Sequence, residues 1–403
     1  MTNEDIIKAA FKVWGRELYR TTSLAEIAQE LGVSKPALYR HFKDKDALLD
    51  AMYTSYYDDC ASFIKPGCEK AAKAESCKEA YILLMRTITE YYLKNREAFG
   101  FSLVRVYNSR DKEIVNREFA KRGIDFNHLV EKIEPEYPPV MQLVMATLVF
   151  FTAEFHRKNG KSIEEPTSEE INNILSEIEG RIKNGLGMDK AKMDAINYED
   201  LERRAARMLF DEAEDNTLLK AVAEAIAEGG PWDTSMEMVA KRSGLSKSGL
   251  YAHFKNKQDM LGQLFITEFN RMVNFAKAQI ETSEIHEDQL YLAIITIVHY
   301  LRERREILLA IDKLKTRQLE LGKEIYSRLF RIIKSIKLEA IRNFDTRRLV
   351  DFAQWILFMI VNTLAWRPIE IENNEWLKNV SEVSNKSFRF LFRYIALGLE
   401  GVL

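Results

Sequence analysis

One short pattern occurs twice in this chain. The segment Thr22 to Lys45 returns 212 positions later as Thr234 to Lys257, and 12 of the 24 aligned residues are identical without a gap. A spacing near 200 residues is far longer than the unit of a solenoid, which runs to roughly 20 to 50 residues. The repetition therefore indicates two fused domains, and a length of 403 residues allows each of them its own hydrophobic core.

The composition indicates an all-α fold. Helix-forming residues dominate, only 8 prolines occur, and no long stretch alternates apolar and polar residues as a half-buried strand would. No apolar run reaches the roughly 18 residues that span a bilayer, and Met1 to Ala10 has the pattern of a polar helix rather than a signal sequence. We therefore expect a cytoplasmic protein without a membrane partner. Cys60, Cys68 and Cys77 fit neither a paired framework nor a zinc spacing, which favours plain reduced thiols.

Each copy of the pattern predicts a helix, a tight turn and a second, shorter helix, the geometry that lays a helix into a DNA major groove. Apolar side chains recur at helical spacing in the first copy, at Leu24, Ile27, Ala28 and Leu31. Gly32 follows them and Gly244 follows their counterparts, and glycine supplies the positive φ that a sharp interhelical turn often demands. Ser34 and Ser246 then stand where the N-cap of the next helix is expected.

The short second helix carries the candidate groove readers. In the first copy Leu38 is expected to face inward, which leaves Lys35, Pro36, Ala37 and Tyr39 to face outward. Side chains in these positions are the ones that can reach the edges of bases in the groove.

Basic residues gather around this helix, although the net charge of the whole chain is only -2. Ser34 to Lys45 holds four basic residues against one acid, and the second copy holds three against none. A further helix is expected to begin where Asp44 or Asn256 caps it, so that Lys45 or Lys257 lies at a positive helix end suited to a phosphate. Such contacts position a protein on DNA without reading its sequence.

The string GVSKPALYRHFKDKDALLDAM, preceded by an amphipathic helix, closely resembles the signature of the TetR family of transcriptional regulators. Its copy GLSKSGLYAHFKNKQDML resembles the same signature, and the likeness covers about 45 residues in each half. The resemblance implies a three-helix DNA-binding head, a larger helical body that binds a small molecule, and paired heads that grip a palindromic operator.

Carried over by position in the motif, the resemblance implies one set of DNA-facing residues in each half. In the first half they are Thr22, Ser23, Lys35, Pro36, Ala37, Tyr39, Arg40, His41 and Lys45. In the second half they are Thr234, Ser235, Lys247, Ser248, Gly249, Tyr251, His253 and Lys257. Two positions depart from the family pattern: Leu18 stands where glycine is usual, and Ser243 replaces the apolar counterpart of Leu31.

Long helical patterns follow each head, and the whole chain is therefore predicted to have five parts. They are a first head at 1–48, a first ligand-binding and dimerisation body at 49–187, a charged helical linker at 188–214, a second head at 215–260 and a second body at 261–403. Gln142 to Phe155 and Phe352 to Leu364 are apolar on nearly every face, which suits helices covered on several sides. Since the last two helices of the family form its dimer seam, we expect the two halves to form an intramolecular pseudo-dimer. A dimer of chains with four heads is the alternative.

The resemblance also implies an apolar cavity for a small apolar or amphipathic effector in at least one body. Aromatic residues crowd both bodies, and most of them are expected to be ordinary core. Polar groups in apolar surroundings need partners, so they are candidates as well. The candidate ligand-binding residues are Tyr92, Phe101, Tyr107, Glu154, Tyr291, Phe358 and Asn362.

The function predicted is a ligand-responsive transcriptional repressor that binds double-stranded DNA at an operator with two unequal half-sites. An enzyme is the first alternative, and it has little support because the chain contains no glycine-rich phosphate loop, no metal-spaced His or Cys cluster and no GxSxG signature. No catalytic residue, metal or cofactor is therefore expected. The second alternative is a helical ligand-binding or partner-binding protein whose heads no longer bind DNA. The retained SK, LY and HFK blocks argue against it.

Overall fold

The computed structural model describes residues 1–16, 23–106, 113–126, 128–129, 139–159, 166–207, 217–230, 233–315, 330–336, 338–365 and 384–403. Every regular element in these ranges is a helix, which confirms the all-α prediction for the described part of the chain. The chain divides into two compact units, Met1–Gly180 and Arg181–Leu403. In neither unit is a described helix long and apolar enough to cross a bilayer.

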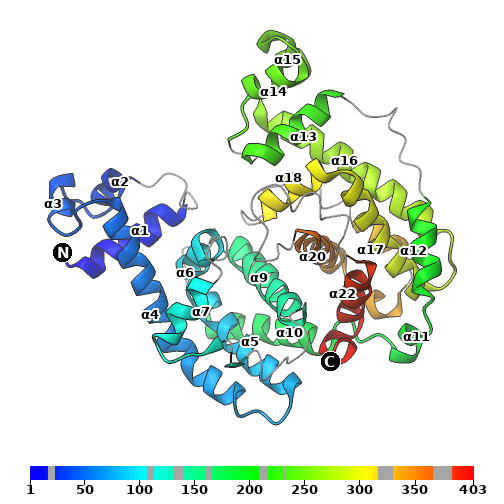
Figure 1. Cartoon of the computed structure of the whole chain (residues 1–403), viewed down its shortest axis with the longest axis horizontal. Coiled ribbons are helices and arrows are strands. Elements are labelled where there is room, and N and C mark those ends of the chain that lie inside the picture. The colour runs from blue at the N-terminus through cyan, green and yellow to red at the C-terminus, as the bar shows by residue number, and fades with distance from the viewer. Residues whose placement is uncertain are drawn as a thin grey trace. The chain divides into compact units, whose positions relative to one another are not determined.

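The first unit consists of a small head and a helical body that share the long helix α4 (Figure 1). The head comprises α1 (Asn3–Arg16), α2 (Leu24–Glu30), α3 (Lys35–Tyr39) and the first turns of α4 (Lys45–Ala71). The body continues with α5 (Cys77–Lys94), α6 (Arg96–Phe101), the π-helix η1 (Ser102–Val106), α7 (Glu113–Ala120), α9 (Pro139–Asn159) and α10 (Ser168–Asn184). The last turn of α10 already belongs to the second unit.

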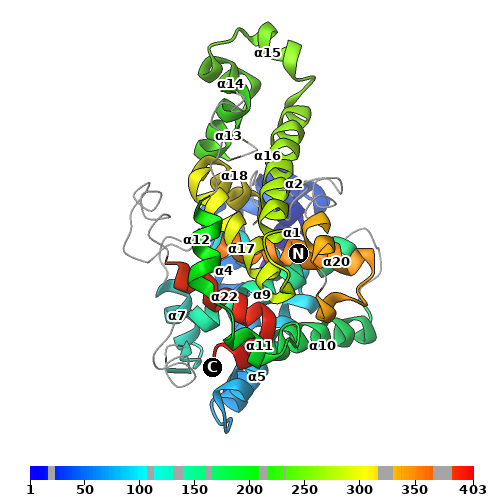
Figure 2. The same cartoon turned by 90° about the vertical axis from the view of Figure 1, so that its right-hand side faces the viewer.

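The second unit repeats this plan after two additional short helices. Those are α11 (Lys190–Asp194) and α12 (Tyr198–Ala206). The head comprises α13 (Thr217–Gly229), α14 (Met236–Ser243), α15 (Lys247–His253) and the first turns of α16 (Lys257–Ile280). The body contains α17 (His286–Glu303), α18 (Arg305–Lys315), helical residues 330–335, η3 (Glu339–Ile341), α20 (Thr346–Leu364), α22 (Asn385–Leu397) and η4 (Gly398–Gly401). Figure 2 shows α14 and α15 at the tip of this unit, beyond α13 and α16.

Each head closes around its own small apolar core, because apolar residues recur on the inner faces of its helices. In the first head the fully or nearly fully buried side chains include Ile6, Ala10, Trp14, Ile27, Leu38 and Leu48. In the second head they include Val222, Ala225, Ile226, Val239, Leu250 and Met260. The turns match the sequence-based expectation, since φ is +66° at Gly32 and +71° at Gly244.

Both predicted caps of the long head-to-body helices are confirmed. Asp44 Oδ1 accepts a hydrogen bond from the Ala47 amide at 2.8 Å, and Asn256 Oδ1 accepts one from the Asp259 amide at 2.9 Å. Each cap satisfies one amide that has no partner within its helix, and a cap of this kind stabilises a helix by about 1 kcal/mol.

Helix α4 runs further than the sequence predicts. The apolar pattern predicts an end at Ile64, just before Pro66, but the helix continues through the proline to Ala71. A proline inside a helix costs about 3 kcal/mol, because it removes one hydrogen bond and crowds the preceding turn. The packing of α4 on α5 offsets this cost, and it is so close that a Cβ at Gly67 would overlap the side chain of Thr87.

The segment predicted as a linker contributes a helix to the second unit. Helix α12 packs against α17, and its Glu202 is only 8% exposed. Arg389 of α22 donates two hydrogen bonds to this carboxylate, at 2.7 and 2.9 Å, and the Tyr291 hydroxyl donates a third at 2.7 Å. Burial by itself raises the pKa of Glu202, but the hydrogen bonds from Arg389 and Tyr291 outweigh it and lower the pKa. The domain boundaries of the sequence analysis stay a prediction.

The ends of two corresponding helices meet in the second unit. Gly185 directly follows α10, and Gly398 directly follows α22 and lies 213 positions later, close to the period of the repeat. A Cβ on Gly185 would lie 2.5 Å from the carbonyl oxygen of Ile395, and a Cβ on Gly398 would lie 2.6 Å from that of Ile182. Because residues 182 and 395 are also 213 positions apart, the contact is reciprocal.

Candidate nucleic-acid interface

The first head presents a short exposed helix. On α3 the side chains of Lys35, Pro36 and Tyr39 are exposed, the last to 46%, and Arg40 at its end is exposed as well. The Lys35 Nζ atom lies 5.9 Å from the centre of the Tyr39 ring, a cation–π distance that leaves the ammonium group at the surface. The head therefore offers two cations and an aromatic ring on one outward side of the α2–α3 pair.

The residues that flank α3 are also placed at the surface. His41 is exposed, and its Nδ1 lies 2.7 Å from Oδ1 of Asn3. Lys45 is exposed at the first position of α4. Ser23 is the N-cap of α2, where its hydroxyl accepts a hydrogen bond from the Ala25 amide at 3.1 Å.

The second head has the same arrangement on α15. Lys247, Ser248 and His253 are exposed, and Tyr251 is exposed to 46%, the same fraction as its counterpart Tyr39. Gly249 and Lys257 are partly buried. Ser235 caps α14 through a hydrogen bond from the Met238 amide at 3.2 Å. The Ser246 hydroxyl caps α15, accepting from the Gly249 amide at 3.0 Å, whereas Ser34 makes no such bond to α3.

Two residues predicted to face DNA are buried, and the prediction is wrong for their side chains. Ala37 is 9% exposed because the first turn of α3 packs on α2, so a residue beside the inward Leu38 also turns inward. Thr234 is 1% exposed, and its hydroxyl donates to the carbonyl oxygen of Gly230 at 2.8 Å. Its counterpart Thr22 lies outside the described residues.

One ion pair distinguishes the second head. Lys247, the first residue of α15, pairs with Glu237 in the first turn of α14. The hydrogen bond between them lowers the pKa of Glu237 and raises that of Lys247, so both groups are charged at neutral pH. The residue that corresponds to Glu237 in the first head is Ala25, and no ion pair to Lys35 occurs among the described residues.

A buried charge cluster connects the second head to its body. Glu268, in the middle of α16, is fully buried and accepts hydrogen bonds from the Tyr300 hydroxyl at 2.5 Å, from Arg304 at 3.1 Å and from Arg271 at 3.2 Å. Arg304 lies between α17 and α18, and α18 packs against α13 of the head. Burial and the negative charge of Glu268 raise the pKa of Tyr300, which keeps this phenol protonated as a donor.

The first unit has a neutral network at the same place. Tyr56, which is 212 positions before Glu268, has its hydroxyl 2.8 Å from that of Tyr92. The Tyr92 hydroxyl in turn lies 2.9 Å from Oγ of Ser102. Burial raises the pKa of both phenols, so this chain of hydroxyls carries no charge at any physiological pH. The two heads are thus joined to their bodies by different chemistry.

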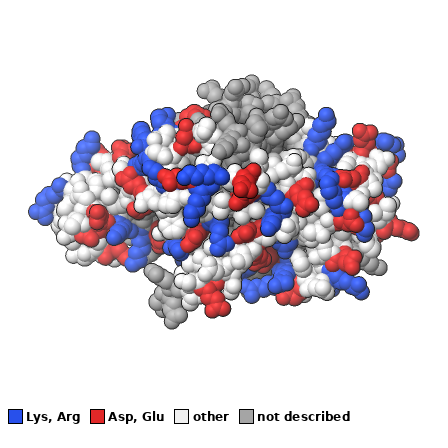
Figure 3. Space-filling view, turned by 90° about the horizontal axis from the view of Figure 1, so that it is seen from below, with Lys and Arg blue, Asp and Glu red and all other residues white. Residues whose placement is uncertain are grey.

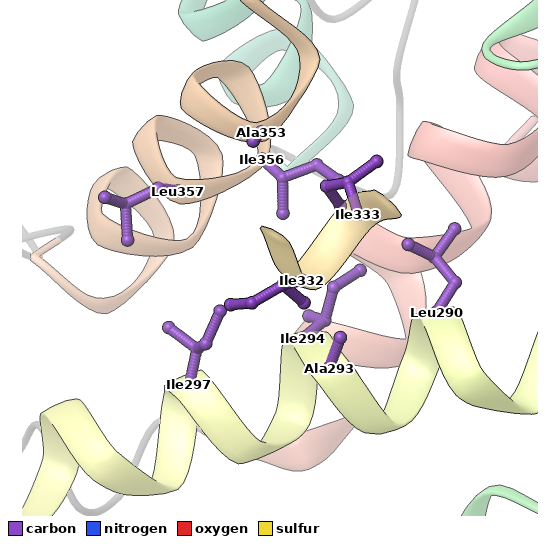
Figure 4. A pocket seen from close by; sticks show the side chains of 9 residues that line it. All are labelled: Leu290, Ala293, Ile294, Ile297, Ile332, Ile333, Ala353, Ile356 and Leu357. Atoms are coloured by element: carbon purple, nitrogen blue, oxygen red, sulfur yellow. The ribbon is translucent and has the colours of Figure 1, made fainter. Parts of the chain in front are cut away.

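The second body contains an apolar pocket between α17, residues 330–335 and α20. Figure 4 shows the aliphatic side chains that line it: Leu290, Ala293, Ile294, Ile297, Ile332, Ile333, Ala353, Ile356 and Leu357. The lining has no titratable group, so the pocket suits an apolar molecule rather than a charged one.

The predicted ligand-binding residues lie near this pocket or in the other body. Tyr291 and Phe358 belong to the two lining helices without lining the pocket themselves, and Asn362 is buried further along α20. In the first unit Phe101 is fully buried, with its ring centre 5.1 Å from that of Phe11, and Tyr92 belongs to the hydroxyl network. Glu154 pairs with Arg157 on its own helix. Tyr107 lies outside the described residues.

Positive and negative side chains are mixed on one face of the molecule. On the face that Figure 3 shows, Lys and Arg side chains are interspersed with Asp and Glu among the described residues. Within the described ranges no group of three or more His, Cys, Asp or Glu residues is placed to hold a metal ion. The feature that distinguishes the exposed cations of α3 and α15 is their position on the short helices of the heads.

Comparison with known proteins identifies the heads. The model of the bacterial regulatory proteins of the tetR family matches residues 6–52 and again residues 218–264. The chain contains two TetR-family DNA-binding domains. The first match begins in α1 and ends in α4, and the second begins in α13 and ends in α16. Each match therefore includes all the helices of one head.

Curated relatives share parts of the chain. The uncharacterised HTH-type transcriptional regulator YuxN of Bacillus subtilis is 33% identical over 98 residues, which are 24% of this chain and 33% of YuxN. YerO, described in the same words, is 46% identical over 46 residues, 11% of this chain and 16% of YerO. The fatty acid metabolism regulator protein of the same organism is 29% identical over 77 residues, 19% of this chain and 40% of that protein. The chain thus matches less than half the length of each of these relatives.

Two solved structures are also similar. The fatty acid degradation regulator FadR from Bacillus halodurans aligns with 47% of this chain and 97% of its own, at 18% identity and a TM-score of 0.33. FadR from Bacillus subtilis, solved in complex with stearoyl-CoA, aligns with 45% of this chain and 97% of its own, at 21% identity and a TM-score of 0.36.

Sequence reasoning missed Glu268, Glu202 and Glu237. Glu268 had a visible signal, because it stands in α16 at helical spacing from the buried Phe265 and Met272, where an apolar residue is expected. An acid in such a position needs a buried partner. Glu202 had a weaker signal, since its segment is rich in charge throughout.

Proposed function

We propose that this protein is a transcriptional repressor of the TetR type that binds one operator through both of its heads and is released by a small apolar effector. The observation that carries the proposal is the pair of short exposed helices α3 and α15, each on a capped and closed TetR head. An exposed tyrosine and an exposed lysine one turn apart on each helix suit contact with DNA, the lysine by charge and the ring by its apolar face.

The two half-sites of this operator differ in sequence. In the second head Ala252 replaces Arg40, Gly249 replaces Ala37 and Ser248 replaces Pro36. Loss of the arginine removes one cation and the side chain that most often reads guanine through two hydrogen bonds. In a fused chain each reading helix can diverge by itself, whereas the heads of a homodimer cannot.

We propose further that the two halves form a pseudo-dimer within one chain. The reciprocal contact of Gly185 and Gly398 supports this arrangement, because it relates corresponding residues of the two repeats as a two-fold axis would. The segments Gln142 to Phe155 of α9 and Phe352 to Leu364 of α20 are apolar on nearly every face, which agrees with helices that need cover from more than one direction. Light scattering on the purified chain checks this proposal, since a clear mass of two chains would mean that the pseudo-dimer is not the whole assembly.

Selection of bound sequences from random duplex DNA is the experiment that tests DNA recognition. We expect two different half-sites with centres about one helical turn apart or slightly more. On the selected operator, Lys35→Ala is expected to reduce affinity by about 1 to 2 kcal/mol, and Lys247→Ala by less, because Lys247 is already paired with Glu237. A perfect palindrome with equal losses for both variants would contradict unequal half-sites. Absence of any salt-dependent binding would favour a ligand-binding protein with inactive heads.

The apolar pocket of the second body is the proposed effector site. Its aliphatic lining suits an acyl chain, and one relative is named a fatty acid metabolism regulator, so fatty acids of graded chain length are a suitable first panel. An effector that prefers one spacing of the heads shifts the population away from the DNA-binding state, and a coupling of about 1 to 3 kcal/mol changes operator affinity roughly 5- to 150-fold.

Filling the pocket is expected to remove the response to the effector. In Ala293→Leu the added methyl groups occupy the space between α17 and α20, so operator affinity should stay near that of the wild type while release by the active compound is lost. Gel shift with and without the compound measures both quantities, and thermal unfolding checks that the variant is folded. A broad panel in which no compound changes operator affinity would remove the sensing part of the proposal.

A further inference from the structure

Glu237 occupies a position at which the second head has a carboxylate and the first head has a small apolar side chain. It is the second residue of α14, and its counterpart in α2 is the exposed Ala25. Head residues at the start of this helix stand beside the reading helix, because the tight turn folds α14 back on α15. The reading lysine of the second head is therefore paired with a carboxylate, whereas no ion pair to Lys35 of the first head occurs among the described residues.

The carboxylate makes a direct contact with that lysine. Glu237 and Lys247 form an ion pair while the side chain of each is 58% exposed, so both remain accessible to a phosphate or a base. In the first head the corresponding Lys35 lies over the ring of Tyr39 instead, with its Nζ atom 5.9 Å from the ring centre. The same lysine is thus occupied in one head and available in the other.

The ion pair has two consequences for DNA binding. The ion pair between Lys247 and Glu237 has to break before Lys247 can contact a phosphate. Breaking it offsets most of the binding free energy that one phosphate contact gains by counterion release. After Lys247 has left, the carboxylate stands uncompensated close to the negatively charged backbone, and like charges at such distances repel. Both consequences weaken the second head, and neither acts on the first.

We propose that Glu237 sets the order of recognition, so that the first head anchors the protein on DNA and the second head binds only where its half-site supplies enough additional contacts to displace the ion pair. This inference rests on the proposed function and names a specificity-determining residue within it. The missing arginine at Ala252 acts in the same direction, because it leaves the second reading helix with one cation fewer than the first.

The test exchanges the residues of the two heads in the full chain. Glu237→Ala gives the second head the residue of the first, Glu237→Gln keeps the size of the side chain without its charge, and Ala25→Glu is the matched variant in the first head. Affinity for the selected operator is measured over a range of salt concentrations, and thermal unfolding checks that these exposed substitutions leave the fold intact.

The expected result has four parts. Glu237→Ala and Glu237→Gln should bind the operator about three- to tenfold more tightly, and the slope of log affinity against log salt should steepen by about 0.9, the value for one additional phosphate contact. Ala25→Glu should weaken binding by a similar factor. Lys247→Ala should cost little in the wild-type chain and several-fold more in the Glu237→Ala background. Variants of the second half-site should also be discriminated less well by Glu237→Ala than by the wild type.

Two results would overturn the inference. If the wild type binds the operator and both Glu237 variants leave its affinity and salt slope unchanged, the ion pair has no effect on recognition. If both variants weaken binding to one particular half-site sequence only, Glu237 reads a base as an acceptor and does not restrain Lys247. A wild-type chain without salt-dependent DNA binding would instead overturn the proposed function, and the inference with it.

Discussion

Gly398→Ala is expected to lower the free energy of unfolding of the second unit by about 2 to 4 kcal/mol. Gly398 has φ +62° and ψ -144°, a backbone conformation that only glycine adopts without strain. In addition, the new Cβ would lie 2.6 Å from backbone atoms of Asn184, Gly185 and Ile182, which cannot move aside as a flexible side chain would. Gly185→Ala meets the same obstacle from the other side, so a loss of similar size is expected.

Gly187→Ala is the matched control for these two variants. Gly187 also has a positive φ, +67°, but among the described residues beyond its chain neighbours no atom lies within 4 Å of the position of its Cβ. Its replacement therefore introduces backbone strain of about 1 kcal/mol without a collision. Unfolding by urea measures all three variants, and equal losses at the three glycines would mean that the helix ends do not meet as described. If the pseudo-dimer proposal holds, the first two variants also reduce the advantage of an operator with two half-sites over one with a single half-site.

The features that followed from the sequence are those set by local chemistry. The positive φ of Gly32 and Gly244 and the caps at Asp44 and Asn256 depend on residues within a few positions, so the pattern alone predicts them. The all-α class and the two TetR heads followed for the same reason, since the motif residues are contiguous and occur twice.

The features that the sequence did not predict depend on contacts between distant segments. Helix α4 passes through Pro66 because α5 packs against it, and nothing near the proline indicates this. Ala37 was predicted to face outward because helical spacing alone cannot decide which of two neighbouring positions on a five-residue helix is covered. Glu202 gains its partner Arg389 from 187 positions away, a distance over which no local pattern gives information.

The largest loss of stability is expected from Glu268→Gln, at about 3 to 5 kcal/mol. Glu268 is fully buried, and Arg304 and Arg271, with side chains 15% and 19% exposed, both depend on its charge. A neutral amide removes the buried counter-charge that these two cations share, while Arg304 keeps its ion pair with Glu306 at 3.0 Å. Breaking such a buried cluster costs far more free energy than the intact cluster contributes relative to apolar residues. The double variant Glu268→Leu with Arg304→Met should therefore recover part of the loss, which chemical denaturation can show.

The matched variant in the first unit is Tyr92→Phe, because Tyr92 belongs to the neutral network at the same joint. This substitution removes the hydrogen bonds of one hydroxyl and leaves no unpaired charge, so a loss of about 1 kcal/mol in the free energy of unfolding is expected. A loss at Glu268 no larger than that at Tyr92 would contradict the view that the second joint is held by charge.

Glu268→Gln also separates the two heads functionally. Arg304 lies directly before α18, which packs on α13, so loss of the Glu268 cluster is expected to loosen the second head on its body and to leave the first head unaffected. Footprinting of Glu268→Gln at a temperature where the chain is still folded is expected to show protection of the first half-site with reduced protection of the second. Protection lost equally at both half-sites would indicate that the cluster supports the whole molecule and does not hold one head in place.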